Sequence, residues 1–194
     1  MKNLMTGLLR GRITRWSIPA VVLAAGGLLL ARPPLVQYQF GGAWIGSGGG
    51  ITASVFDMPC DPAGRTTAMR ITPLTHPAEI AGLLATFGAD TITESAAQAE
   101  MISQDTAKWT SVGYFTKQGN PPLICMIYVM KGTLKFTGPD RRVVNYTADY
   151  YPGPANALGL PSADADGDGF PDPGTTPVLS LPDLVQIAKR VTVP

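Results

Sequence analysis

Hydrophobic and polar residues alternate in short runs along most of the chain, and turn-forming residues separate the runs. This two-residue period is typical of strands that bury one face. The predicted strands cover 35–44, 51–58, 66–73, 91–103, 108–116, 123–130, 132–138 and 142–151. Because short connections force neighbouring strands to run antiparallel, the pattern predicts a mainly β fold: an antiparallel meander of about eight strands that closes toward a barrel.

Three segments depart from simple alternation. Residues 76–88 carry apolar residues at spacings of three and four, followed by Gly88, which predicts one short helix laid against the sheet. Residues 123–130 are apolar throughout and predict a strand buried on both faces. Residues 180–191 begin near a proline and predict a second short helix that docks on the barrel.

Composition supports this interpretation. The chain is 45% hydrophobic, with 22 glycines and 18 prolines, which suits short strands and turns better than long helices. Residues 1–32 hold five basic residues and no acid, so the rest of the chain has an acidic balance. An acidic body without a basic stripe argues against a nucleic-acid partner.

The N-terminal segment has the pattern of an export signal. A basic leader precedes an uncharged run at residues 16–31, which is shorter than the ~20 residues that span a membrane comfortably. We expect the chain beyond it to be exported, to the periplasm, the extracellular space or the outer side of a membrane. Two alternatives stay open: a cleaved signal peptide, or an uncleaved anchor that contacts the membrane through residues 16–31. The predicted divisions are therefore 1–34 for the signal or anchor, 35–152 for the β domain and 153–194 for a C-terminal segment rich in Pro, Gly and Asp.

Cys60 and Cys125 are the only two cysteines. In an exported chain they are a candidate disulfide, which would close a loop of about 65 residues and stabilise by ~4 kcal/mol. The alternative is two separate buried thiols.

Four aspartates and three glycines crowd residues 163–174. Calcium takes six to eight oxygens, and a 12-residue loop supplies them from alternate positions, with glycine at position 6. Counting from Asp164 places Gly169 at that position and small uncharged residues between the ligands. The predicted ligands are Asp164, Asp166, Asp168, the carbonyl oxygen of Phe170, and Asp172. A solvated linker without a metal is the alternative, and the regular spacing favours Ca²⁺.

This stretch resembles the aspartate-rich calcium loops of thrombospondin type 3 repeats and dockerins. The resemblance covers about 10 residues and implies a structural calcium site in an extracellular protein. It departs from the pattern at position 12, where Thr175 stands in place of an acid, so we expect weak affinity, with Kd ~0.1–1 mM.

A second, shorter resemblance involves Gly42 and Trp44. In the first strand of a meander, Gly-x-Trp is similar to the motif of lipocalins, where the Trp closes one end of the barrel. It implies a lipocalin-like barrel whose interior holds a small apolar ligand or is filled by its own side chains.

No arrangement of residues predicts catalysis. The single histidine, His76, stands alone, and the acids outside 163–174 are scattered. We therefore expect a non-catalytic exported β-domain with a structural calcium ion, acting by binding an unknown protein partner in an envelope or extracellular assembly. The alternatives are a subunit of a membrane complex held by an uncleaved N-terminal helix, and a carrier of a small apolar ligand.

Overall fold

A computed structural model describes residues 40–48, 51–71 and 78–192. The predicted signal or anchor at 1–34, the first part of the predicted strand 35–44, and His76 lie outside the described residues. No helix in the described part of the chain is long and apolar enough to cross a membrane.

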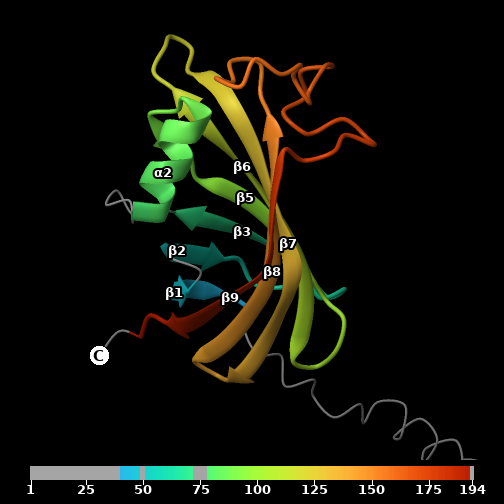
Figure 1. Cartoon of the computed structure of the whole chain (residues 1–194). Coiled ribbons are helices and arrows are strands. Elements are labelled where there is room, and N and C mark those ends of the chain that lie inside the picture. The colour runs from blue at the N-terminus through green and yellow to red at the C-terminus, as the bar shows by residue number, and fades with distance from the viewer. Residues whose placement is uncertain (1–39, 49–50, 72–77, 193–194) are drawn as a thin grey trace, which may run out of the picture. The chain divides into compact units, whose positions relative to one another are not determined.

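The described residues form a mainly β fold with one helix (Figure 1). The helix is α2 (Ala78–Phe87). The strands are β1 (Gly42–Gly48), β2 (Ile51–Asp57), β3 (Arg65–Ile71), β4 (Thr91–Ile92), β5 (Ser95–Met101), β6 (Thr106–Lys117), β7 (Leu123–Gly138), β8 (Arg141–Pro152) and β9 (Leu179–Arg190).

The strands close into an antiparallel barrel. The order β6-β5-β3-β2-β1-β9-β8-β7 is completed by pairing of β7 with β6, which makes a ring of eight strands. Within the ring, strands that follow one another in the chain pair with each other, and the last strand, β9, pairs with the first, β1. The short β4 lies outside the ring and pairs with β6. The predicted antiparallel meander that closes into a barrel is confirmed, as is the single helix packed against it.

Two predictions about elements are wrong. The predicted strands 123–130 and 132–138 are one continuous strand, β7, because the polar residues around Lys131 stay in the ladder with β6 and β8. The predicted helix at 180–191 is the strand β9. There Gln186 and Ala188 are buried while Val185 and Ile187 are exposed, which is the period of a strand. The acidic segment therefore lies in the connection between two neighbouring barrel strands.

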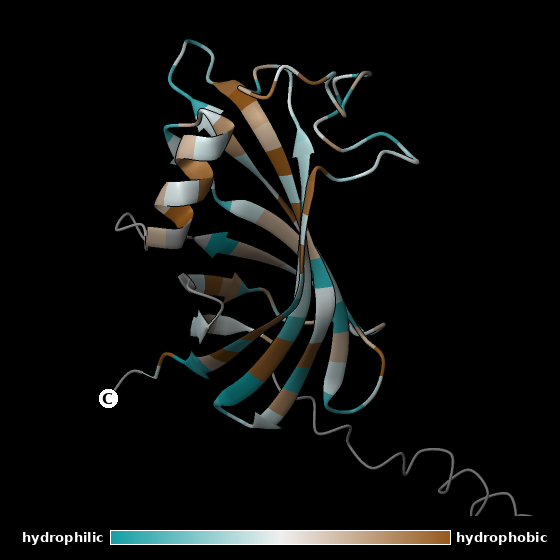
Figure 2. Ribbon diagram, in the orientation of Figure 1, coloured by the Kyte–Doolittle hydropathy of each residue, from teal (hydrophilic) through white to brown (hydrophobic). Residues whose placement is uncertain are grey.

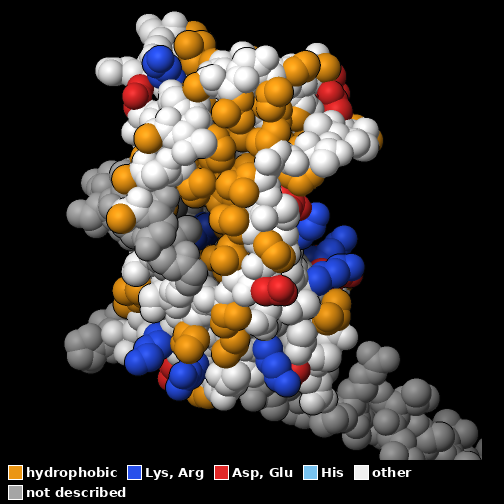
Figure 3. All heavy atoms as spheres, viewed as in Figure 1, with side chains coloured by type: hydrophobic (Ala, Val, Ile, Leu, Met, Phe, Trp, Pro, Cys, Tyr) orange, Lys and Arg blue, Asp and Glu red, His pale blue; other side chains and the backbone are white. Residues whose placement is uncertain are grey.

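The barrel interior near α2 is apolar. Ile80, Leu84 and Phe87 of α2 are buried, and Phe87 packs edge-on against Phe115 with 5.4 Å between ring centroids. The upper half of β7 is the longest hydrophobic band in the barrel (Figure 2). Hydrophobic side chains also gather beside α2 on the viewed face (Figure 3). As expected, β7 is buried on both faces from Cys125 to Tyr128.

Trp44 packs in a different part of the barrel. It is fully buried on β1, and its indole nitrogen donates a hydrogen bond to the Phe40 carbonyl at 3.3 Å. The guanidinium groups of Arg142 and Arg190 lie 4.3 and 4.5 Å from the ring centroid. Two cations on one indole fix its orientation through cation–π attraction, each contact contributing about 0.5–2 kcal/mol.

Candidate functional site

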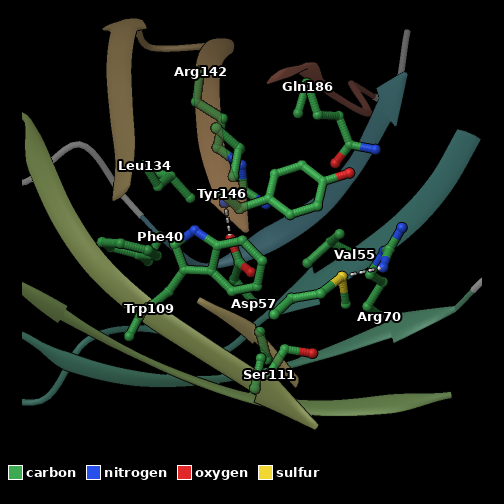
Figure 4. A pocket seen from close by; sticks show the side chains of 16 residues that line it. Phe40, Val55, Asp57, Arg70, Trp109, Ser111, Leu134, Arg142, Tyr146 and Gln186 are labelled. Carbon is green, nitrogen blue, oxygen red and sulfur yellow. Dashed lines mark hydrogen bonds and ion pairs between the residues drawn. The ribbon is translucent and has the colours of Figure 1, made fainter. Parts of the chain in front are cut away.

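The barrel encloses a cavity of about 60 Å³ whose wall is mainly apolar. The lining residues come from β2, β3, β5, β6, β7, β8 and β9, together with Phe40 just before β1, and their side chains converge on the cavity (Figure 4). Its volume is several times what one water molecule needs, so it can hold a small organic group.

Polar atoms without partners surround this cavity. Eight buried side-chain nitrogen or oxygen atoms have no hydrogen-bond partner among the described residues, and six of them belong to residues that line the cavity. These six residues are Arg70, Trp109, Ser111, Arg142, Tyr146 and Gln186. A buried polar group without a partner costs about 1–3 kcal/mol, so this concentration in one place needs an explanation.

Arg142 and Asp57 form a buried ion pair beside the cavity (Figure 4). Both side chains are almost wholly inaccessible, and the pair joins β8 to β2 across the barrel. Burial raises the pKa of the Asp57 carboxyl, and the attraction of Arg142 opposes part of that rise. Burial likewise lowers the pKa of Arg142, against the pull of Asp57. The two charges compensate each other, so the pair adds no net charge to the interior.

Arg70 on β3 has no such partner. Its side chain lies in the interior with the residue only 8% exposed, and its Nη1 donates to the sulfur of Met130 at 2.9 Å. A thioether is a weak acceptor and carries no charge. None of the described carboxylates lies within ion-pair distance of Arg70, and its Nε has no partner. The cavity is therefore lined by two cations and one anion, which leaves one positive charge in excess.

Trp109 and Tyr146 form the aromatic side of the cavity. Their ring centroids are 5.8 Å apart, and neither the indole N–H nor the phenol O–H has a partner in the described structure. Burial raises the pKa of Tyr146, so its hydroxyl stays protonated at neutral pH and keeps a hydrogen to donate. The partnerless atoms of Arg70, Arg142 and Trp109 are N–H donors, and a hydroxyl can donate as well. The interior thus lacks acceptors.

None of these residues was predicted as a site from the sequence. The signal that could have found them is the strand period. On β3, Thr66 and Arg70 are buried whereas Met69 between them is 50% exposed, so an arginine faces inward and a methionine outward. In a strand that buries one face, the inward residues are usually apolar, so an inward arginine is a sign of an internal binding site.

Three of the five predicted calcium ligands, Asp164, Asp166 and Asp168, lie together in the loop between β8 and β9. One carboxylate oxygen from each of Asp164, Asp166 and Asp168 falls within 4.8 Å of the others. The carboxylates also hold the loop's own backbone: Asp168 accepts from the Phe170 amide at 2.8 Å, and Asp172 accepts from the Ala165 amide at 2.9 Å. Asp172 therefore stands at the closing end of the loop, outside the group of three.

The acidic loop is tied to the barrel through Gly169. Its carbonyl accepts a hydrogen bond from the Tyr114 hydroxyl on β6 at 3.1 Å. Gly169 has φ of +87°, and a Cβ there would lie 2.8 Å from that hydroxyl oxygen, so both the turn and the contact require glycine. Burial and the charges of Asp164 and Asp168 raise the pKa of Tyr114, which keeps the donor protonated.

Asp164 differs from the other two members of the acidic group. It is only 8% exposed, whereas Asp166 and Asp168 face solvent. Its Oδ2 accepts from the Gly169 amide at 3.0 Å, and its buried Oδ1 has no partner among the described residues. A carboxylate oxygen in this state suits a metal ligand.

The two cysteines are free thiols in the structure, so the candidate disulfide is not formed. Cys125 is fully buried, with its sulfur 3.7 Å from the Gly88 carbonyl oxygen, and Cys60 is half-buried. Burial raises the pKa of both thiols, which makes them poor nucleophiles at neutral pH.

No known protein-family model matches the chain, and no curated protein matches it in sequence. Among solved structures, the chain is similar to one described as "Crystal structure of Xenavidin", with a TM-score of 0.41 and 8% identity over 78% of this chain and 96% of that one. A likeness this low supports no conclusion about function. The protein's own strand pairing and cavity define its class, a closed antiparallel β-barrel with charged groups buried around an internal cavity.

Proposed function

We propose that the protein is a non-catalytic barrel that binds a small organic molecule in its interior. The observation that carries the proposal is the coincidence of an apolar-walled cavity with six residues whose buried polar atoms have no partner. The apolar body of a ligand would fill the cavity, and its polar group would form hydrogen bonds with some of the partnerless atoms. This favours the ligand-carrier alternative over a barrel filled by its own side chains, with the qualification that the ligand also bears a polar group.

The absence of a reactive arrangement around the cavity supports a binding role. Among the described lining residues, the single carboxylate, Asp57, is engaged by Arg142, and the hydroxyl of Tyr146 is held neutral by burial. Catalysis would need a base beside a nucleophile or a pair of carboxylates.

A thermal-denaturation screen against small polar and amphipathic compounds tests this proposal. We expect at least one chemical class to raise the melting temperature of the wild type, and we expect Tyr146→Phe to weaken the response. Tyr151→Phe is a matched control, because Tyr151 lies on the same strand, half-buried, and does not line the cavity. If no compound raises the melting temperature and a crystal structure shows only water in the cavity, the proposal fails.

The acidic loop is the second candidate site, for a structural Ca²⁺ ion. The observation that favours it is the buried Oδ1 of Asp164, which has no partner and belongs to a group of three carboxylates within 4.8 Å. Asp166, Asp168, the carbonyl oxygen of Phe170, and Asp172 would supply further ligands, and a bound cation would relieve the repulsion among the carboxylates. Export, which residues 1–34 predict, is part of this second proposal, because a Kd of ~0.1–1 mM suits extracellular calcium.

A further inference from the structure

From the charges around the cavity, we infer that the ligand is a small monocarboxylate whose carboxylate pairs with Arg70. The inference rests on the proposed binding function and narrows it to one chemical class. Three features support it: an uncompensated buried cation, a shortage of acceptors, and a small cavity with a mainly apolar wall.

The first feature is the positive charge in excess. A buried ionised side chain is normally paired, because removing an isolated charge from water costs several kcal/mol or more. Asp57 already forms an ion pair with Arg142, and the sulfur of Met130, which contacts Arg70, carries no negative charge. Arg190 acts electrostatically on Asp57 and Arg142, but it lies over Trp44 outside the cavity lining and has a carboxylate of its own, Asp140, at 3.7 Å. One monovalent anion would neutralise the site.

The second feature decides between an anion and a neutral polar molecule. The partnerless atoms of Arg70, Arg142 and Trp109 are N–H donors, which a group rich in lone pairs would satisfy. A carboxylate offers two oxygens that match the fork of a guanidinium, and the resulting charge-assisted bonds are stronger than neutral ones. The Arg70 guanidinium gives up only a weak thioether contact when it turns toward such a group.

The third feature decides between classes of anion. A phosphate monoester carries about −1.5 to −2 charges at pH 7, which exceeds the single excess positive charge. The cavity of about 60 Å³ is also small, and Val55, Leu134 and Val144 give it an apolar wall. The carboxylate of a short-chain monocarboxylate would neutralise the one excess positive charge, and its hydrocarbon chain would contact the apolar wall.

The experiment compares isosteric anions and amides on the full-length protein. Sodium propionate and butyrate are titrated against propionamide and butyramide at constant ionic strength, with melting temperature and calorimetric binding as readouts. We expect the carboxylates to bind and the amides to bind at least about tenfold more weakly, because one charge-assisted hydrogen bond is worth that factor or more. Sodium chloride and sodium phosphate are the inorganic anions in the same series.

Arg70→Met is the decisive variant, and Arg141→Met is its control. Arg141 is exposed on β8 beside the buried Arg142, so its loss removes the same charge without touching the cavity. We expect Arg70→Met to fold, because it removes an uncompensated buried charge and keeps much of the side chain's volume. It should lose the carboxylate response by about tenfold or more, whereas Arg141→Met should keep it.

A measurement on the wild type covers the case in which Arg70→Met does not fold. The NMR signal of the Arg70 Nε–H group should shift on addition of propionate and stay in place with propionamide. Equal responses to carboxylate and amide, a carboxylate response that survives in Arg70→Met, or an equal response to chloride alone would each overturn the inference. If neutral compounds bind in a way that needs Tyr146 but not Arg70, the carboxylate assignment fails while the binding function stands. If neither the carboxylates nor the amides bind, the carboxylate assignment fails, and the wider screen with the crystal structure decides the binding function.

Discussion

The barrel interior and the acidic loop both hold charges of one sign without enough of the other. The interior has two arginines and one aspartate around the cavity, whereas the loop has four aspartates in nine residues. The two sites differ in how far their charged groups are exposed to solvent. Asp166 and Asp168 face water, which lowers their repulsion, while Arg70 is buried against a neutral sulfur.

The difference shows that burial, more than the number of charges, determines how strongly a site requires a ligand. The loop can exist without a cation because its carboxylates accept backbone hydrogen bonds and are largely hydrated. Asp164 is the exception within the loop, since it is buried with one oxygen unpaired, and in that respect it is like Arg70. We therefore expect variants that unpair a buried charge in the interior to have larger effects than variants in the loop.

The largest effect is expected from Asp57→Ala. This change removes the only counter-charge that Arg142 has among the described residues and leaves two uncompensated cations in the interior, which should lower the free energy of unfolding by about 3–5 kcal/mol. Urea denaturation measures the change. Glu100→Ala, which breaks an exposed pair with Lys108, should have a much smaller effect, because solvent screens that pair. A similar small loss for both variants would contradict the assignment of a tightly buried ion pair.

Alkaline pH should produce the next largest effect, in the apolar part of the barrel near α2. Burial raises the pKa of Tyr150 to about 12, above the ordinary value of 10. The folded protein therefore keeps this proton between pH 10 and 12 while the unfolded chain releases it, so the stabilisation is complete below pH 10 and is lost as pH rises toward 12. The contribution is about 2–3 kcal/mol. Between pH 10 and 12 the wild type should lose stability relative to Tyr150→Phe, which has no hydroxyl to ionise, and a constant difference between the two across this range would contradict the prediction.

Calcium should have a smaller effect, located in the loop. With a Kd of ~0.1–1 mM, 10 mM Ca²⁺ should raise the free energy of unfolding by about 1.4–2.7 kcal/mol, and a chelator should reverse the gain. Asp166→Ala should abolish the response. Glu94→Gln, which removes an exposed carboxylate elsewhere, should keep it. An unchanged melting curve with and without calcium would remove the proposed metal site.

The smallest effect is expected from Ser111→Ala without added ligand. The Ser111 hydroxyl is buried without a partner, so its removal should leave stability unchanged or raise it by up to about 1 kcal/mol. Ser180→Ala should instead lower stability by about 1 kcal/mol or more, because its hydroxyl donates to Asp149 at 2.6 Å. A loss at Ser111 as large as that at Ser180 would show that the interior hydroxyl already has a partner.

The parts of the fold that depend on near neighbours in the chain could be predicted from the sequence. Alternation predicted most strands, the spacing of Ile80, Leu84 and Phe87 predicted α2, and the aspartates of the acidic loop lie as close together as their spacing implies. The calcium that this spacing predicts stays a prediction. The segment 179–190 was misassigned because its apolar residues fit a short helix as well as a strand, and only pairing with β1 and β8 decides between them.

The interior site depends on residues that are far apart in the chain. Asp57 and Arg142 are separated by 85 positions, and Arg70 and Met130 by 60. No local pattern predicts that these side chains meet, because the closure of the barrel brings them together. The inward direction of Arg70 was nonetheless readable from the strand period, and inward charges in a predicted barrel strand are a practical sign of an internal site.

The aromatic stack at the cavity has an optical consequence. Trp109 lines the cavity, packs on Tyr146 and has an indole N–H with no partner, whereas Trp44 already donates to Phe40 and is held between two guanidinium groups. Indole emission moves to longer wavelength when the N–H gains a polar neighbour. The third tryptophan, Trp16, lies outside the described residues. Filling the cavity should therefore change the fluorescence of Trp109 and leave that of Trp44 as an internal standard, so that the protein reports its own occupancy without a label.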